Sequence, residues 1–93
     1  MTVGSFKHGG LKRLYERDDA RRISPQHLEK VRAILALLEQ AHNPRDLDAP
    51  GHPLHQPKGQ PDVWSVTISG NWRIVFHFKD GAAWSQRFSE WGF

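Results

Sequence analysis

The spacing of apolar residues changes sharply along this chain, and the change limits the folds that it can adopt. From position 64 to 78 the sequence reads WSVTISGNWRIVFHF, with apolar residues at every second position on each side of Gly70-Asn71. Side chains of a β-strand point alternately to its two faces, so a period of two is typical of strands that bury one face. With Gly-Asn between them, these two runs predict an antiparallel hairpin.

The register of this hairpin has two solutions. Keeping the apolar residues of both strands on one face requires an odd-length loop of Ser69, Gly70 and Asn71. A two-residue turn would instead move the apolar set of one strand to the other face. The sequence alone leaves this choice open.

A period close to 3.6 residues comes earlier in the chain. Ser24 and Pro25 are typical of the cap and the first position of a helix, and Asn43-Pro44 is a stop signal. Between them, apolar residues recur at steps of three and four, at Leu28, Val31, Leu35 and Leu38. These positions form one stripe, which predicts a helix with one buried face.

Three further segments complete the expected fold: a short strand in TVGSFKH (2–8), a helix in LKRLYERDDARRI (11–23) and a final strand in AAWSQRFSEW (82–91). A short strand, two helices and an antiparallel meander predict an α+β fold with the helices on one face of the sheet. With 93 residues, the whole chain 1–93 is expected to form a single domain.

Composition excludes several classes of function. The chain has no cysteine, which removes disulfides and thiolate metal sites, and no apolar stretch near the roughly 18 residues of a membrane span. The start MTVGSFKHGG lacks the apolar core of a secretory signal, so we expect a cytoplasmic protein without membrane contact. The formal net charge of +3 is compatible with a nucleic-acid partner.

A proline-rich segment separates the two patterned regions. Residues 43–62 hold five of the six prolines together with His52, His55 and Lys58. Loops longer than about 12–15 residues are uncommon in compact domains and are usually functional or disordered, although the part around Leu47 is expected to pack locally. His52 and His55 have a spacing that some metal sites use, but no clear third ligand follows, so we expect neither a metal nor another cofactor.

Two residues of the hairpin extend this set. Arg73 and His77 alternate with the apolar residues of their strand, so both are expected on the face away from the helices. The loop with His55 and Lys58 leads into the adjacent strand and can fold over that face. An imidazole, an ammonium and a guanidinium are what RNA cleavage by the ribose 2′-hydroxyl requires, as base, acid and fixed cation. Planes on which bases can stack are offered by Trp84, Trp91 and Arg87.

The run LHQPKG before WSVTISGNWRIVFHFKDG, with the opening SFKHGGLKRLYE, resembles the HigB toxins of the RelE/ParE superfamily, also described as host-killer plasmid-maintenance proteins. The resemblance covers nearly the whole chain, and the Asn-Trp-Arg core together with the loop spacing is its most specific part. It implies a compact microbial RNase-like fold and cleavage of mRNA on the translating ribosome. It also implies a HigA antitoxin with a helix-turn-helix fold, through which alone the toxin would contact operator DNA.

Carried over residue by residue, the site of that family falls on His55, Lys58 and Arg73. The family commonly ends in an Asp-Tyr-His triplet; here Glu90 takes the place of Asp and Trp91 that of Tyr, while Gly92 stands where the terminal His would be. Because this imidazole is missing, His77, which shares the face of Arg73, is a candidate for its acid–base role. The expected catalytic set is therefore His55, Lys58, Arg73, His77 and Glu90. The expected RNA-binding set is Trp84, Lys79, Arg87 and Trp91.

Two other functions stay open. A ParE-like toxin would poison DNA gyrase by binding, with no nuclease chemistry. A basic nucleic-acid-binding or antitoxin-partner module would have lost its activity. The presence of His55, Lys58 and Arg73 together favours the nuclease, whereas the Gly92 ending favours the alternatives.

Overall fold

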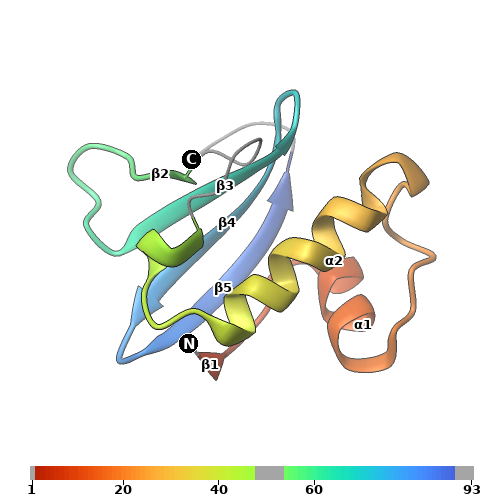
Figure 1. The fold of residues 1–93 in the computed structure, drawn as a ribbon, viewed down its shortest axis with the longest axis horizontal. Coiled ribbons are helices and arrows are strands. Elements are labelled where there is room, and N and C mark those ends of the chain that lie inside the picture. Colours follow the sequence, from red (N-terminus) through yellow and green to blue (C-terminus); the bar gives the residue numbers. More distant parts are fainter. Residues whose placement is uncertain (1, 48–53, 90–93) are drawn as a thin grey trace.

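The structure, a computed structural model, describes residues 2–47 and 54–89 (Figure 1). In chain order its elements are β1 (Thr2–Val3), α1 (Gly9–Arg17), α2 (Pro25–Gln40), the 3-10 helix η1 (Pro44–Leu47), β2 (Leu54–His55), β3 (Val63–Ser69), β4 (Trp72–Lys79) and β5 (Ala82–Ser89). One sheet contains all five strands in the order β1-β5-β4-β3-β2. Neighbours from β2 to β5 pair antiparallel, and β1 lies parallel to β5.

Both helices lie on one face of this sheet (Figure 1), which confirms the predicted α+β arrangement. At the N-terminus, where the sequence predicts one short strand over 2–8, the structure has the two residues of β1 followed by an isolated parallel bridge from Phe6 to Gln86. None of the helices in the described part of the chain is long and apolar enough to cross a membrane.

The core lies between α2 and the sheet. The predicted apolar stripe of α2 is buried at Val31, Leu35 and Leu38, and these residues pack in one cluster with Ile74 and Phe76 of β4. Full burial of one such side chain stabilises the fold by about 1.5–3 kcal/mol relative to leaving it exposed. The predicted local packing around Leu47 is also confirmed, because this residue of η1 is fully buried in the same cluster.

Helix α1 ends earlier than the predicted range of 11–23. Asp18 adopts a left-handed conformation, with a φ of 54°, directly after Arg17. The N–H groups of Asp18 and Asp19 donate to the carbonyls of Leu14 and Arg13, which satisfies acceptors at the end of the helix. The sequence pattern predicts a longer helix than the one that forms. The charged residues directly after Arg17 do not bury a face, so packing does not extend the helix.

His8 caps the start of α1 with its side chain. Its Nδ1 accepts a hydrogen bond from the backbone N–H of Leu11 at 3.1 Å, which satisfies a donor that has no partner inside the helix. Burial, and then the positive charge of Arg22, lower the pKa of His8 from its usual 6.5. The fold therefore favours the neutral imidazole, which is the form whose Nδ1 can accept.

Acid should weaken this cap. The folded-state pKa of His8 lies below its unfolded value, so its contribution to stability is fully present above about pH 6.5 and is lost as the pH falls through the lower folded-state value. We expect His8→Ala to cost about 1 kcal/mol at pH 8 and less at pH 5, measured by urea unfolding. In His8→Ser, whose hydroxyl caps without titrating, the free energy of unfolding should depend less on pH. An equal pH dependence in wild type and His8→Ser would contradict this account.

The β3–β4 hairpin shows how its two sequence patterns fit together. Ser69 pairs with Trp72, so the turn has only the two residues Gly70 and Asn71, which is the second of the two registers that the sequence leaves open. The register then shifts between Ser69 and Thr67, which leaves Ile68 as an extra residue. This bulge returns the apolar residues of β3 to the face of those in β4, so the two-residue turn does not flip a strand.

Candidate active site on the open face of the sheet

The face of the sheet that points away from the helices, here called the open face, carries the candidate site. Trp64, Val66, Ile74 and Phe76 pack with the helices, so their neighbours in sequence project to the other side. Three rows of residues then cross the open face. They are His55–Ser65–Val75–Arg87 in the middle, Thr67–Arg73–Ser89 on one side of it, and Val63–His77–Trp84 on the other.

The position of His55 follows from β2, a two-residue strand that the sequence patterns do not predict. Leu54 pairs with Val66 and packs against the core, so it belongs to the helix side of the sheet. The next residue, His55, pairs with Ser65 and must point to the open face. Its side chain is exposed. Leu54 is thus the anchor that places an imidazole of the proline-rich segment over the sheet.

Arg73 lies on the same face, diagonally across from His55. It pairs with Thr67, two residues along β3 from the partner of His55. Sheet spacings put the two Cα atoms roughly 12 Å apart. Across this distance, an imidazole and a guanidinium can both contact one phosphate group that lies between them. The Arg73 side chain is half-buried.

Ser65 lies between these two residues and was not among the sequence-based candidates. It is fully buried at the centre of the open face, beside the buried Val75. Within the described part of the chain, neither the Ser65 hydroxyl nor Nε of Arg73 has a hydrogen-bond partner. Buried polar groups are normally paired, so these two atoms mark a place where a polar ligand would gain hydrogen bonds. Only its polar character within an apolar, buried strand could have signalled Ser65 in the sequence.

His77 shares the open face with Arg73, as predicted from the alternation of β4. It pairs with Val63 on one side and Trp84 on the other, and its side chain is exposed. His77 lies four residues from Arg73 along β4, about 13 Å, with the buried Val75 between them. His55, Arg73 and His77 therefore surround a buried floor of Ser65 and Val75.

Lys58 lies outside this ring, in the connection from β2 to β3. It is exposed, in a turn whose next residue, Gly59, has a φ of 82°. The side-chain amide of Gln56 donates to the carbonyl of Pro61 and ties the two ends of this connection together. Lys58 follows His55 by three residues in the sequence. No described contact joins its ammonium to Arg73.

The remaining candidates divide between described and undescribed residues. Arg87 lies on the open face at the end of the middle row, and Trp84 stands beside His77 with 44% of its surface exposed. Lys79 is exposed at the end of β4, where its carbonyl accepts a hydrogen bond from the Trp84 indole at 3.2 Å. Glu90, Trp91, Gly92 and His52 lie outside the described residues.

The side chains of the open face suit acid–base and electrostatic chemistry on an anion. They comprise two imidazoles and two guanidinium groups, and no described carboxylate belongs to the three rows. Residues 2–47 and 54–89 contain no group of three or more His, Cys, Asp or Glu side chains that could hold a metal ion. Of the described members of the predicted catalytic set, the sheet brings together His55, Arg73 and His77, and it leaves Lys58 in the adjoining turn.

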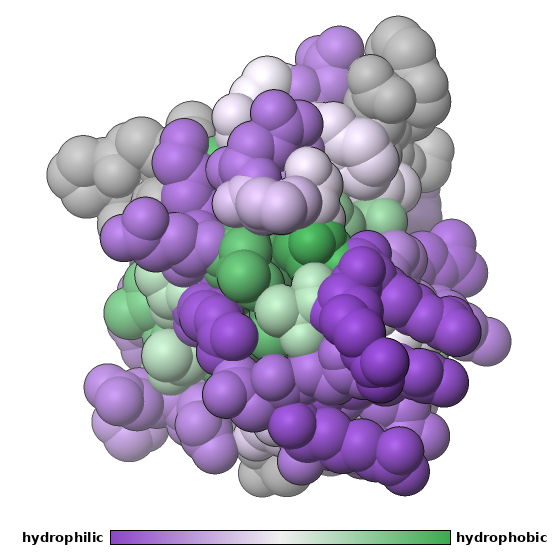
Figure 2. All heavy atoms as spheres, turned by 90° about the vertical axis from the view of Figure 1, so that its right-hand side faces the viewer, coloured by the Kyte–Doolittle hydropathy of each residue, from purple (hydrophilic) through white to green (hydrophobic). Residues whose placement is uncertain are grey.

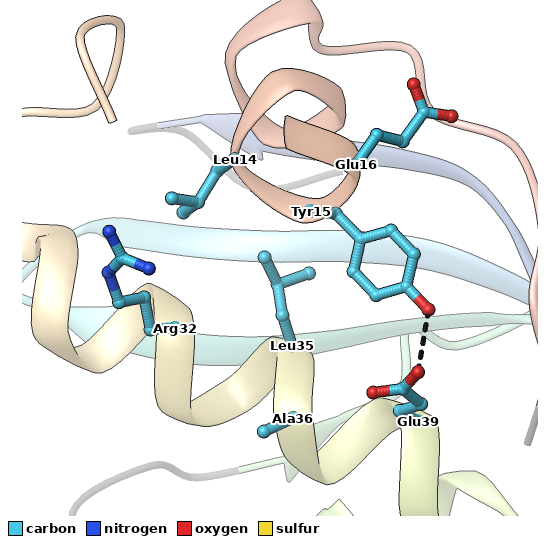
Figure 3. A pocket seen from close by; sticks show the side chains of 7 residues that line it. All are labelled: Leu14, Tyr15, Glu16, Arg32, Leu35, Ala36 and Glu39. Atoms are coloured by element: carbon cyan, nitrogen blue, oxygen red, sulfur yellow. Dashed lines mark hydrogen bonds between the residues drawn. The ribbon is translucent and has the colours of Figure 1, made fainter. Parts of the chain in front are cut away.

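A hollow of about 530 Å³ lies elsewhere, between α1 and α2. Figure 3 shows the residues that line it: Leu14, Tyr15, Glu16, Arg32, Leu35, Ala36 and Glu39. The Tyr15 hydroxyl donates a hydrogen bond to Glu39 at 3.1 Å, and burial, followed by Glu39, raises the pKa of Tyr15. On this side of the molecule a hydrophobic patch is surrounded by hydrophilic residues (Figure 2). We call the hollow between α1 and α2 the interhelix groove.

Two comparisons with known proteins identify the family of the chain. The sequence model of the HigB-like toxin family, described as the RelE-like toxin HigB of a type II toxin–antitoxin system, matches residues 4–87. The chain is also 31% identical to the endoribonuclease HigB of Proteus vulgaris over 90 residues, which are 96% of this chain and 98% of that protein. The resemblance seen in the sequence is thereby confirmed. The chain belongs to the HigB-like family of RelE-like toxins, the toxins of type II toxin–antitoxin systems.

Proposed function

We propose that this toxin is a metal-independent endoribonuclease that cuts mRNA on the translating ribosome. The observation that carries the proposal is the strand register, which collects His55, Arg73 and His77 around a buried floor on the open face. The name of the Proteus vulgaris relative, endoribonuclease HigB, supports the same chemistry. We further propose that the toxin acts in the cytoplasm as one domain spanning 1–93.

His55 is proposed as the general base. It would take the proton of a ribose 2′-hydroxyl while the 2′-oxygen attacks the adjacent phosphorus. The bond from phosphorus to the 5′-oxygen of the next nucleotide then breaks, and that oxygen takes up a proton. Arg73 would hold the additional negative charge that the phosphorane carries, with Lys58 as a second cation from the neighbouring turn.

His77 is proposed as the acid that protonates the leaving 5′-oxygen. It faces the buried floor from the side opposite to Arg73, and its exposed imidazole can carry a proton to the leaving group. This role would replace the terminal histidine that the resemblance expects at Gly92. Glu90 and Trp91 remain proposed members of the site by resemblance, and Trp84, Arg87 and Lys79 are proposed RNA contacts.

The decisive experiment is primer extension on a translated message in a cell extract. New 5′ ends should appear within the coding region when the toxin is added, and they should be absent when ribosomes are removed. Intact message combined with inhibited DNA supercoiling would instead identify a gyrase poison. Intact message with normal supercoiling and normal growth at high expression would identify an inactive binding module.

The partner of the toxin is an antitoxin, as its family implies. We propose that this antitoxin is a HigA-like helix-turn-helix protein, that it alone contacts operator DNA, and that a segment of it occupies the interhelix groove. Leu14, Leu35 and Ala36 give the groove apolar walls, and Ala36 is small enough to let a helix approach closely. Arg32 and Glu39 supply charges of both signs at its edge, which suits an amphipathic segment with a mixed polar face.

A carboxylate in the groove should weaken this complex. We expect Ala36→Glu to lower the affinity for the antitoxin at least tenfold, because a carboxylate would lose its hydration against the apolar segment. Isothermal titration with purified antitoxin measures the change. Ala33→Glu is the matched control, since Ala33 is also an exposed alanine of α2 but does not line the groove. Equal affinities for the two variants would show that the antitoxin binds elsewhere.

A further inference from the structure

A bulge in β5 shapes the open face beside the candidate catalytic ring. Val75 pairs with Arg87 and His77 pairs with Trp84, so the single residue Phe76 faces two residues of β5. One of these two, Ser85, has a φ of 53°, a left-handed conformation that is uncommon outside glycine. Bulges of this kind bend a strand and re-aim its side chains, often next to active sites.

The bulge leaves a small hollow between His77 and Arg87. Its volume is about 90 Å³, and its lining is Gln60, Val63, Val75, His77, Ser85 and Arg87. In a regular strand, the open-face residues before and after the bulge would be two positions apart. Here Trp84 and Arg87 are three apart, so the space above Ser85 is wider than ordinary strand pairing leaves.

The lining combines an apolar floor with polar groups of different kinds. Val63 and Val75 are both buried at 8% exposure and form the floor. Gln60 carries a donor and an acceptor in one plane, and the Arg87 guanidinium presents donors only. A pocket for drug-sized ligands measures about 300–1,000 Å³, so this hollow fits one ring-sized group.

We propose that this hollow receives one nucleobase of the RNA, next to the phosphate held by His55 and Arg73. The proposal rests on the proposed ribonuclease function and names a subsite for its substrate. A base matches the hollow in three respects: a flat ring lies on the valine floor, its edge hydrogen-bonds to Gln60 and Arg87, and its neighbour can stack on the exposed Trp84 beside His77.

A bare phosphate matches the hollow less well. It would use the cation of Arg87 but would place charged oxygens against Val63 and Val75. The Gln60 amide can instead distinguish bases, because the pattern of donors and acceptors on the base edge differs among the four nucleotides. Gln60 is therefore assigned a role in base preference, which its position in the loop sequence does not reveal.

The cleavage test compares four messages that differ at one nucleotide of the cleaved sequence. For wild-type toxin, single-turnover rates on ribosomes should differ among the four messages. In Gln60→Ala the rate on the preferred message should fall about fivefold, the effect of one lost hydrogen bond, and the differences should shrink. Gln40→Ala, an exposed glutamine on α2, should keep the wild-type rates and differences. An equal fall on all four messages would overturn the base-reading role.

A binding test separates this inference from the nuclease itself. The methyl resonances of Val63 and Val75 are followed by NMR while each of the four ribonucleoside 5′-monophosphates is added, with ribose 5-phosphate as the probe that lacks a base. The inference expects shifts that depend on the base and that Gln60→Ala diminishes. Shifts that are equal for ribose 5-phosphate, or no shifts with any nucleotide, would overturn it. Base-dependent shifts in a toxin that cuts no message would support base binding in the hollow and would contradict the proposed nuclease activity.

Discussion

His55→Ala should slow RNA cleavage by about 10²–10⁴-fold, the contribution typical of a general acid or base. His55 is exposed, and the anchoring of β2 is provided by the neighbouring Leu54, which packs against the core. Truncating the imidazole should therefore remove a reacting group and leave the fold intact. Single-turnover cleavage of a ribosome-bound message measures the rate, and thermal unfolding measures the stability.

The matched control for this prediction is His42→Ala. His42 is also an exposed histidine, but it follows α2 and is not part of the open face. We expect wild-type cleavage from it. If His55→Ala also cleaved at the wild-type rate, the base would have to be another group, and the proposed mechanism would be wrong in its first step.

Arg73→Ala should lower the cleavage rate by about 10²–10³-fold, as expected when one preorganised stabiliser of transition-state charge is removed. Arg73 lies half-buried beside the buried Ser65, where water screens charge less than at an exposed surface. Arg73→Lys should recover only part of the rate, because an ammonium cannot offer the two parallel donors of a guanidinium.

The measurement should separate binding from chemistry. Charge stabilisation in the transition state predicts a loss in the single-turnover rate at saturating ribosome concentration, with a smaller change in affinity. Arg17→Ala, an exposed arginine at the end of α1, is the control and should cleave normally. A variant Arg73→Ala that binds weakly but cleaves at the wild-type rate once saturated would show that Arg73 only binds RNA.

Local patterns in the sequence predict much of the fold. The stripe from Leu28 to Leu38 predicts α2, and the alternation from Trp64 to Phe78 predicts β3 and β4, because burial of one face imposes its period directly on the sequence. The same alternation places Arg73 and His77 on one face without any tertiary information. The family also follows from the sequence, since its motifs occupy matching positions along nearly the whole chain.

Tertiary structure decided the features that depend on pairing between distant residues. Whether His55 faces the open side depends on the pairing of Leu54 with Val66, which no pattern in a proline-rich segment encodes. The extra residues at Ile68 and Ser85 fit the strands to one another and open the hollow beside His77. A sequence period reports which face a residue occupies within its own strand. The register between strands is set by the packing of the whole sheet, and that register assembles the site.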